Sequence, residues 1–353
     1  MRFERLGLDE WVHRWTGVGT NLDISGMPSP YQEFLPEVEW GQSPLELERR
    51  LLELISSLYG VEEDRVALTF GAQNANSLAM MTQLSSGDLV VSERPIYEPM
   101  RVVAEALCSV IDLPRRREND FAIDIDELHS LMRGASMLMI TNLHNPTAAV
   151  LGDDILATIA EVVEDRGALL LCDEIYREMS YHHPPRPAHD FPEVGVTTNG
   201  MTKLYGLGDL RVGWLIGPQE VAEAVDAARR AMAWNLPSHS MALAISALER
   251  KDWFRERMLE LARGNLKLLK RWSSREERAR FRWPDGALMF SLELPEGIDD
   301  MAFSETLLSK YDTAVCPGSY FGAPGQVRVT FSCAASKFER GLENISLAMD
   351  HLS

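Results

Sequence analysis

The first lysine in the chain, Lys203, lies in a stretch whose composition suits covalent chemistry. Glycines stand at positions 206 and 208, and Arg211 follows shortly after them. A lysine on a glycine-lined turn beside a fixed cation suits an amine that bonds covalently to an aldehyde cofactor carrying a phosphate. The residues from Val212 to Gly217 then form a short apolar run, which is typical of a buried strand.

Two further polar positions follow apolar runs. Asp173 ends the run Ala-Leu-Leu-Leu-Cys and is followed by Glu-Ile-Tyr176, and Asn145 follows the run at 137–140. A carboxylate at the end of a buried strand is costly unless it has a cationic partner. Asp173 is therefore either a helix cap or a group that holds a proton on a cofactor ring nitrogen. Taken alone, the pair Asn145-Pro146 indicates only a turn.

Short apolar runs alternate with helical stretches over the first two thirds of the chain. Continuous apolar strands between helices predict a mostly parallel sheet that is covered on both faces. Ligands of such sheets bind beyond the carboxyl ends of the strands, so polar residues that follow different strands are expected to converge. The expected strands lie at 66–70, 88–91, 137–140 and 168–172, and the expected helices at 74–84, 97–107 and 152–165.

The pattern changes after residue 249. A long helix, Trp253 to Trp272, leads into alternating strands, with helices near 300–310 and 336–351. The sequence therefore predicts three parts: residues 1–40 as an N-terminal arm that also completes the small domain, 41–249 as the large cofactor-binding domain, and 250–353 as a small α+β domain.

Composition excludes several classes of partner. The net charge of −18 at pH 7 would repel nucleic acid and anionic membranes, so neither is expected to bind. The N-terminus lacks an apolar signal region, and no stretch reaches the ~18 uninterrupted apolar residues of a membrane helix. The four cysteines are scattered without metal-binding spacing. They predict a cytoplasmic protein with reduced thiols and no metal site.

The stretch around the first lysine resembles a known motif. Pyridoxal-phosphate enzymes of the aspartate aminotransferase fold (fold type I, class I/II aminotransferases) carry Ser-x-Ser/Thr-Lys and then, after seven residues, Arg-x-Gly. Thr202, Lys203 and Arg211 fall at matching positions. Gly200 stands where the first serine is usual, which removes one hydroxyl donor to the cofactor phosphate. The resemblance implies that Lys203 forms the Schiff base with pyridoxal 5'-phosphate.

Other motifs of the family concern the cofactor ring. Asp173 and Tyr176 match the family's Asp-x-x-Tyr, which implies that Asp173 holds the proton on the pyridine nitrogen and that Tyr176 contacts the ring 3-oxygen. Asn145 matches the Asn-Pro-Thr-Gly asparagine, which contacts the same oxygen and borders the substrate. Tyr97, in Pro-Ile-Tyr, resembles the residue that stacks on the ring. A plain core role for Tyr97 remains open.

The family resemblance also extends to both ends of the ligand. Gly71, Ala72 and Gln73 resemble the Gly-Ala-x-x-Ala loop, in which backbone N–H groups at a helix start hold the phosphate. Arg328 lies in a β-branched strand where the family places the arginine that binds the substrate α-carboxylate. Gly26, in the N-terminal arm, is expected to offer a backbone N–H to the same carboxylate.

Together these motifs imply the α/β fold of pyridoxal-phosphate transferases: a large domain with a mostly parallel seven-stranded sheet between helices, and a smaller α+β domain. They also imply a homodimeric aminotransferase that transfers an amino group from an α-amino acid to a 2-oxo acid by a ping-pong scheme. Lys203 would then carry the Cα proton. Trp40 falls roughly where the family's partner-supplied aromatic usually lies.

Two other functions use the same residues. Lyases, decarboxylases and cyclases of this fold share the catalytic groups, so they remain the alternative. A non-catalytic effector-sensing module is disfavoured because too few residues precede the first domain helix for a winged helix and an arm. The absence of arginine between residues 231 and 248 disfavours a dicarboxylate such as aspartate as the substrate.

Overall fold

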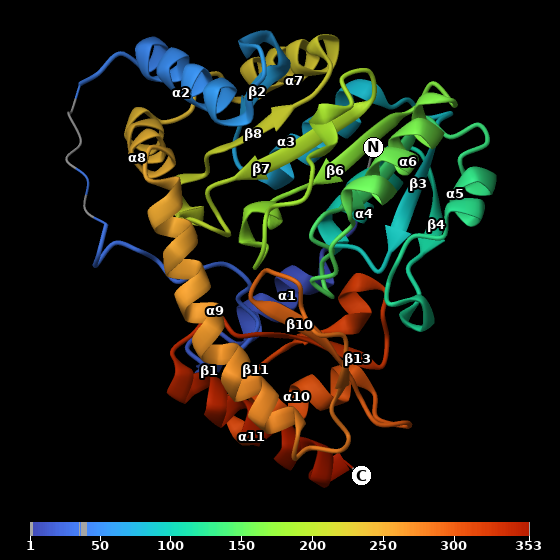
Figure 1. Ribbon diagram of the computed structural model, residues 1–353, viewed down its shortest axis with the longest axis vertical. Coiled ribbons are helices and arrows are strands. Elements are labelled where there is room, and N and C mark those ends of the chain that lie inside the picture. Colours follow the sequence, from blue (N-terminus) through green and yellow to red (C-terminus); the bar gives the residue numbers. More distant parts are fainter. Residues whose placement is uncertain (1–2, 35, 37–40, 353) are drawn as a thin grey trace.

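The computed structural model describes residues 3–34, 36 and 41–352 (Figure 1). Its centre is a seven-stranded sheet with the order β2-β8-β7-β6-β5-β3-β4. All neighbours pair in parallel except β8, which is antiparallel to both β2 and β7. The predicted mostly parallel seven-stranded sheet is thus confirmed. Its strands are β2 (Val66–Thr69), β3 (Leu89–Arg94), β4 (Ser109–Pro114), β5 (Met137–Thr141), β6 (Leu169–Asp173), β7 (Gly195–Gly200) and β8 (Gly213–Ile216).

Helices cover both faces of this sheet, which explains why its central strands are continuous apolar runs. Successive side chains of a strand point to opposite faces. Leu170 accordingly belongs to the cluster with helices α5 and α6, whereas Leu171 packs in the cluster of α3, α4 and α7. Helices α2 and α8 pack together near β2 and β8. The bounds are α2 (Pro44–Tyr59), α3 (Ala72–Gln83), α4 (Glu98–Leu107), α5 (Ile125–Leu131), α6 (Asp153–Glu164), α7 (Gln219–Ala233) and α8 (Ser238–Leu248).

The C-terminal part forms a second, antiparallel sheet with the order β12-β13-β10-β9. It lies in the lower half of Figure 1 beside the helices α9, α10 and α11. The long helix α9 runs from α8 into this part and also contacts the loop after β6. The bounds are α9 (Lys251–Ser273), β9 (Arg280–Phe281), β10 (Met289–Glu293), α10 (Asp300–Tyr311), β11 (Thr313–Ala314), β12 (Cys316–Pro317), β13 (Gln326–Thr330) and α11 (Ala335–Leu352).

The N-terminal segment packs on the C-terminal part, far away in sequence. Helix α1 (Gly7–Arg14) places the Trp11 indole N–H 2.9 Å from the carbonyl oxygen of Val315. Strand β1 (Thr20–Asn21) pairs in parallel with β11, and Leu22 is fully buried. The boundaries of the three domains remain a prediction. Helix α9 starts close to the proposed division and touches both parts.

Three elements of the large sheet region were not predicted: strands β4 and β7 and helix α5. Strand β4 lies at the edge of the sheet, so only Leu113 among its residues is buried, and it has no continuous apolar run. Helix α5 is short.

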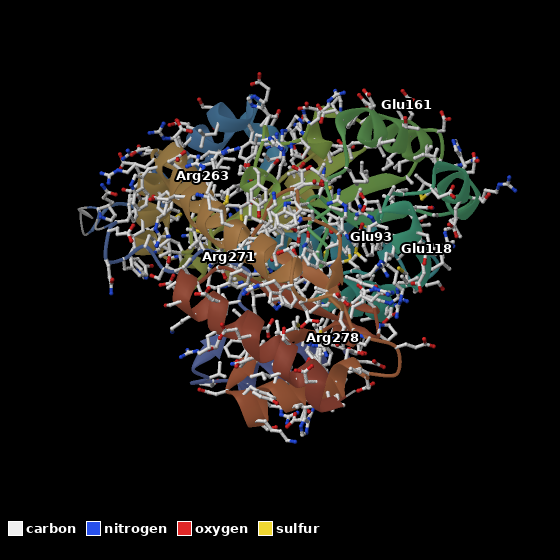
Figure 2. All side chains as sticks on the ribbon, turned by 60° about the horizontal axis from the view of Figure 1, so that its bottom comes forward. Glu93, Glu118, Glu161, Arg263, Arg271 and Arg278 are labelled. Carbon is white, nitrogen blue, oxygen red and sulfur yellow. The ribbon has the colours of Figure 1, made fainter. Side chains whose placement is uncertain are left out.

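The exposed Glu118 and Glu161 contrast with Glu93, which is fully buried inside the molecule (Figure 2). In the described ranges, no helix is long and apolar enough to cross a membrane.

Candidate active site

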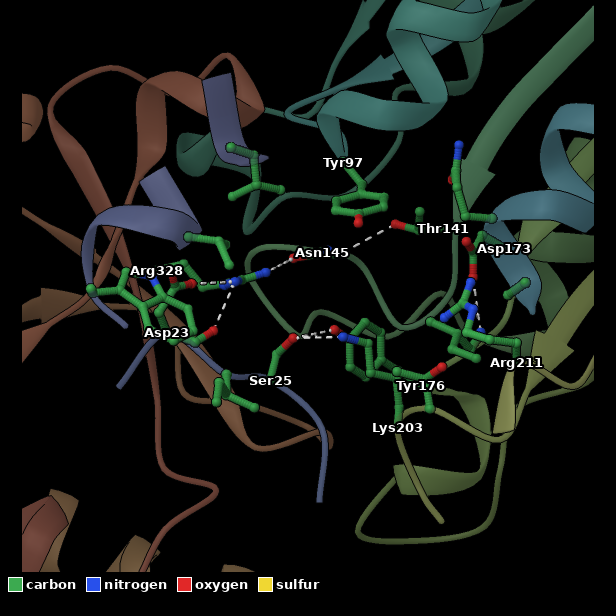
Figure 3. A pocket seen from close by; sticks show the side chains of 18 residues that line it. Asp23, Ser25, Tyr97, Thr141, Asn145, Asp173, Tyr176, Lys203, Arg211 and Arg328 are labelled. Carbon is green, nitrogen blue, oxygen red and sulfur yellow. Dashed lines mark hydrogen bonds and ion pairs between the residues drawn. The ribbon is translucent and has the colours of Figure 1, made fainter. Parts of the chain in front are cut away.

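A pocket of about 340 Å³ lies where the carboxyl ends of β5, β6 and β7 face the N-terminal segment and β13 (Figure 3). This location is the one expected for ligands of parallel sheets. Gly26 and Gly71 border the pocket without lining it. The predicted residues that do line it are Ala72, Gln73, Tyr97, Asn145, Asp173, Tyr176, Thr202, Lys203, Arg211 and Arg328.

Lys203 lies in the loop that follows β7. Its Nζ donates a hydrogen bond to Ser25 Oγ at 3.0 Å and lies 5.4 Å from the centre of the Tyr176 ring. The hydroxyl groups of Ser25 and Tyr176 are 2.7 Å apart. The amine therefore faces the pocket beside two hydroxyl groups that can accept or return a proton.

The N-terminal segment passes directly over the lysine loop. The Met27 N–H donates to the Lys203 carbonyl oxygen at 2.8 Å. A Cβ atom on Gly26 would lie only 2.8 Å from the Thr202 carbonyl oxygen, so this close approach requires glycine. The predicted contact of Gly26 with a substrate carboxylate remains a prediction.

Asp173 ends β6 with its carboxylate in the pocket. Oδ2 accepts from the Asn76 side-chain amide at 2.7 Å, and Oδ1 accepts from the Ile175 N–H at 3.0 Å. Asn76 is held in turn, because its Oδ1 accepts from the Thr198 hydroxyl at 2.6 Å. Burial raises the pKa of Asp173, although the two hydrogen bonds and nearby Lys203 oppose the shift. Both hydrogen-bond donors to this carboxylate are thus neutral, whereas its buried position would favour a cationic partner.

At the end of the pocket where Asp173 and Arg211 lie, β2 turns tightly into α3. Gly71 adopts φ +86°, and α3 starts at Ala72, so the first backbone N–H groups of the helix have no acceptor within the helix. Arg211 lies beside this turn and donates to the Phe70 carbonyl oxygen at 3.0 Å. A Cβ atom on Gly71 would lie 3.0 Å from the Arg211 Nη2 atom. Helix start and guanidinium together make a site suited to a phosphate.

Gly200 also has a structural reason. A Cβ atom at this position would lie 3.0 Å from the Val212 carbonyl oxygen and 3.3 Å from the Ala72 nitrogen. The residue before β8 and the start of α3 therefore leave little space for a serine side chain here. Thr202 lines the pocket instead and carries a hydroxyl group.

A buried hydrogen-bond chain holds Asn145. Its backbone N–H donates to Thr141 Oγ1 at 3.1 Å, and this hydroxyl donates to Glu93 Oε1 at 2.6 Å. Glu93 forms an ion pair with Arg115 at 2.8 Å, and both side chains are buried. Burial raises the pKa of Glu93, and Arg115 opposes that shift. The Asn145 loop is therefore tied to the ends of β3, β4 and β5.

At the far end of the pocket, Arg328 of β13 is buried over the Phe321 ring. Its Nη2 donates to the Asp23 carboxylate at 2.8 Å and to the Asp23 carbonyl oxygen at 2.9 Å. Its Nη1 donates to Asn145 Oδ1 at 3.3 Å. Burial lowers the pKa of Arg328, but the acidic neighbours Cys316 and Asp23 outweigh this effect, and the net pKa is raised. The side chain is thus a fixed cation.

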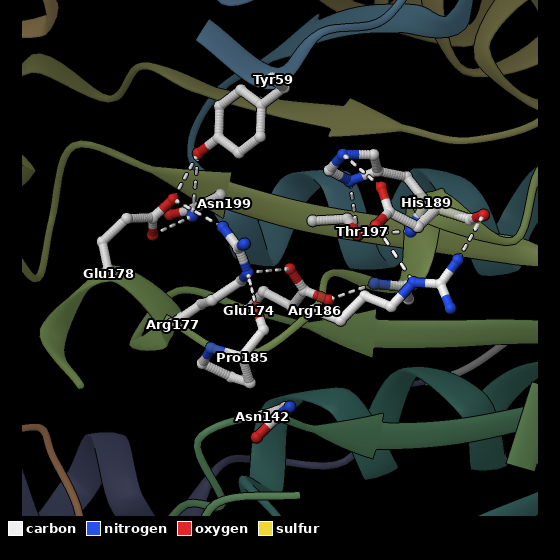
Figure 4. Close-up of polar contacts among 12 residues, drawn as sticks. Tyr59, Asn142, Glu174, Arg177, Glu178, Pro185, Arg186, His189, Thr197 and Asn199 are labelled. Atoms are coloured by element: carbon white, nitrogen blue, oxygen red, sulfur yellow. Dashed lines mark hydrogen bonds and ion pairs between the residues drawn. The ribbon is translucent and has the colours of Figure 1, made fainter. Parts of the chain in front are cut away.

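A second polar layer lies behind the lysine loop (Figure 4). Asn199 donates to Glu178 at 2.8 Å and to the Tyr59 hydroxyl at 3.3 Å, while its own side-chain oxygen accepts from the Gly200 N–H at 2.7 Å. Burial would raise the pKa of Glu178, but the cations Lys251 and Arg177 lower it overall. The end of β7 is therefore anchored just before the lysine.

Sequence reasoning missed four residues of this arrangement: Asp23, Ser25, Thr141 and Asn76. Thr141 directly follows an expected strand, so its place at the sheet edge could have been found. Asp23 and Ser25 lie in the N-terminal segment and reach the site only through tertiary packing. Trp40 lies outside the described residues. The catalytic and binding roles of the predicted residues remain predictions.

This chain is similar to a known protein family and to named relatives. The family described as aminotransferase class I and II matches residues 41–345. Capreomycidine synthase of Streptomyces vinaceus is 30% identical over 80% of this chain and 73% of its own length. Aspartate aminotransferase of Pyrococcus horikoshii is 27% identical over 86% of this chain and 81% of its own length.

Solved structures agree in fold. A PLP-dependent aminotransferase from Streptococcus suis superposes with a TM-score of 0.88 at 24% identity, covering 100% of this chain and 99% of the other. A PLP-dependent cyclase, OrfR, superposes with a TM-score of 0.87 at 26% identity, with the same coverage. The transferase fold extends over the whole chain.

Proposed function

The chain belongs to the class I and II aminotransferase family and uses pyridoxal phosphate, and we propose that it transfers the amino group of an α-amino acid to a 2-oxo acid by a ping-pong scheme. One observation carries the proposal. Lys203, which follows β7, lines one pocket with Asp173 and Tyr176, which lie at the end of β6. This pocket lies between two guanidinium groups, those of Arg211 and Arg328.

The residues fit this cofactor. Gly71, with φ +86°, brings the turn close to Arg211, and the start of α3 offers free N–H groups, so a phosphate is well matched there. Asp173 is a buried carboxylate with neutral donors, so a protonated ring nitrogen would provide the missing cation. We propose that Ala72, Gln73, Thr202 and Arg211 hold the phosphate.

When bound, pyridoxal phosphate supplies an aldehyde carbon for amines and a ring that accepts the electron pair left at Cα. We propose that Asp173 keeps the ring nitrogen protonated and that Tyr97 packs on the ring face. Asn145 and Tyr176 would donate to the ring oxygen. Lys203 is the amine that attaches the cofactor, and its Nζ would move the proton from Cα, with Ser25 orienting the amine through their hydrogen bond.

The alternative activity is that of a lyase, decarboxylase or cyclase. It deserves equal testing because one relative is named a synthase and a structural neighbour a cyclase. The same proton transfers at Lys203 serve both outcomes, so the pocket residues do not separate them. A non-catalytic effector module remains a third function, which any turnover would exclude.

The deciding experiment mixes the protein, loaded with pyridoxal phosphate, with single amino acids. An aminotransferase converts the bound cofactor to pyridoxamine phosphate and releases one equivalent of the matching 2-oxo acid, and a second oxo acid then restores the original absorbance. Release of ammonia or carbon dioxide, or a cyclic amino acid product, with the cofactor spectrum recovering unaided, would contradict transamination.

We further propose that the protein is a cytoplasmic homodimer. Three large apolar side chains are mostly exposed near α2 and α7: Leu45 at 67%, Met232 at 61% and Trp234 at 69%. Glu48 of α2 forms ion pairs with Arg229 and Arg230 of α7, which brings these helices together. Exposed apolar groups gathered on one side favour contact with a second subunit.

A further inference from the structure

The substrate end of the pocket holds two opposite charges. Arg328 is the predicted anchor of the α-carboxylate, and Asp23 is its ion-pair partner. Asp23 is only 3% exposed, and its other carboxylate oxygen accepts from the Trp15 indole N–H at 2.8 Å. Figure 3 shows both side chains at the end of the pocket away from Asp173.

The contacts of Arg328 leave its binding edge incomplete. A guanidinium group has five N–H donors. It can bind a carboxylate bidentately through either of two edges, Nε with Nη2 or Nη1 with Nη2, and each edge uses one N–H of Nη2. When Nη2 donates to both the carboxylate and the carbonyl oxygen of Asp23, both of its N–H groups are occupied. Nη1 keeps one free N–H, and Nε is buried without a partner. A substrate carboxylate must therefore share Nη2 with Asp23 or displace it.

Binding of that carboxylate changes the charge balance. One guanidinium would then face two carboxylates in a buried setting, and one negative charge would lack a counter-ion. Among the lining residues that the structure describes, the other cations are Lys203 and Arg211. Arg211 lies at the opposite end of the pocket, Lys203 is hydrogen-bonded to Ser25, and both are assigned to the cofactor. The missing cation must therefore come from the substrate.

We propose that Asp23 is a specificity-determining residue that favours amino acids with a cationic side chain over neutral and acidic ones. This inference rests on the proposed aminotransferase function and names its substrate class. The pocket wall beside Asp23 supports it, because Leu8, Val12, Trp15 and Ile24 offer apolar surface to an aliphatic stem. A stem ending in a guanidinium or ammonium group would then place its charge against the Asp23 carboxylate.

The test compares arginine with citrulline, its neutral analogue of the same shape, in the protein loaded with pyridoxal phosphate. We expect kcat/KM of the first half-reaction to favour arginine by roughly tenfold or more. Glutamate is expected to react more slowly than both. Asp23→Asn, which keeps the size of the side chain, should bring the ratio of arginine to citrulline close to one and improve reaction with citrulline.

Equilibrium binding separates this inference from the proposed function. The unreactive acids 5-guanidinopentanoate and 5-ureidopentanoate have a carboxylate and the two end groups but no α-amine. Calorimetry should show tighter binding of the guanidino acid by wild-type protein and loss of that preference in Asp23→Asn. If the preference exists but no amino acid converts the cofactor, the proposed function fails and this inference stands as a statement of ligand preference.

Equal binding of both acids by the wild-type protein, or an unchanged preference in Asp23→Asn, would overturn the role of Asp23 even when amino acids react. The wild-type comparison decides the matter if Asp23→Asn does not fold. Trp15→Phe supplies a second variant, because it removes the indole N–H from the carboxylate and keeps an aromatic ring, although a smaller one, in the pocket wall. It should alter the preference while leaving Arg328 in place.

Discussion

Lys203 has an environment that explains how an amine could both attach a cofactor and carry a proton. Its Nζ contacts Ser25 Oγ, and that hydroxyl group is also hydrogen-bonded to Tyr176. Ser25 therefore touches both, and it comes from a segment that no catalytic motif marks. Among the described residues, Nζ is thus held in the pocket by a hydroxyl group and forms no ion pair with a carboxylate.

We predict that Lys203→Ala keeps the fold and loses activity by a factor of at least roughly 10²–10⁴, because both covalent attachment and proton transfer disappear. Absorbance after borohydride treatment checks the attachment, since only wild-type protein should retain reduced cofactor after denaturation. Lys267→Ala, on the surface face of α9, is the matched control. Wild-type turnover in the Lys203 variant would refute the assigned role.

At the residue scale, the sequence predicted the residues that follow buried strands. Asp173 and Asn145 come after apolar runs that end at the same sheet edge, so their convergence follows from fold class together with motif. Lys203 was found by its motif alone, because the strand before it, β7, is not a continuous apolar run. Asp23 gave no such signal. It reaches Arg328 only because β1 pairs with β11, and a pairing between distant segments leaves no periodic pattern in either of them.

The edge strand β4 and its neighbour β3 end at a buried ion pair whose energetics differ from those of surface pairs. Arg115 pairs with Glu93 inside the protein, and its Nε also donates to the Phe121 carbonyl oxygen at 2.6 Å. The adjacent Arg116 pairs with Glu127 at the surface. Removing Arg115 would leave Glu93 as a buried charge without a counter-ion.

We predict that Arg115→Met lowers the free energy of unfolding by about 3–5 kcal/mol. Arg116→Met, one residue later, should cost less than about 1 kcal/mol. Urea denaturation of both variants measures this contrast. Equal losses would show that burial of the Glu93 pair has no special weight. Because Glu93 also holds Thr141 and hence Asn145, Arg115→Met should in addition weaken cofactor binding.

The loop between β6 and β7 depends on Glu174, which is fully buried (Figure 4). Its Oε1 accepts from the Ala188 N–H at 2.6 Å. Burial raises the pKa of Glu174 to about 8, although Arg177 opposes this shift. A folded-state pKa above the unfolded value means that the folded protein binds the proton more tightly, so the stabilisation is full at low pH and is lost as pH rises through about 8.

We therefore predict that wild-type protein loses stability relative to Glu174→Gln as pH increases from about 6.5 to 8.5, by at most about 1.4 kcal/mol per pH unit. His189, whose pKa burial lowers to about 4, changes stability below this range and is common to both proteins. Unfolding midpoints across the range provide the measurement. A difference independent of pH would rule out a titrating Glu174.

At the element scale, prediction succeeded where an element has its own pattern. Helix α9 has a long apolar stripe, and β5 and β6 are continuous apolar runs, so all three were expected. Strand β4 was not predicted because it is an edge strand with mostly accessible side chains. Backbone pairing fixes its register with β3. Its position depends on the neighbour and not on its own composition.

For the whole molecule, the exposed apolar groups near α2 and α7 predict a dimer of the 39.7 kDa chain. Trp234→Glu should shift the protein toward monomer, since a buried interface tryptophan commonly contributes about 2 kcal/mol or more. Trp283→Glu is the control, because Trp283 is 44% exposed on the C-terminal part. Light scattering over a dilution series gives the mass, and an unchanged mass in Trp234→Glu would contradict this interface.

The N-terminal segment has a consequence for how the protein is made. Leu22 accepts a hydrogen bond from Thr330 through its carbonyl oxygen, and the neighbouring residues bind the lysine loop. The ribosome releases these first residues long before it has produced the strand that fixes them. The reactive pocket can therefore assemble only after nearly the whole polypeptide has emerged, so a stalled or prematurely terminated chain has the central sheet but lacks a finished pocket.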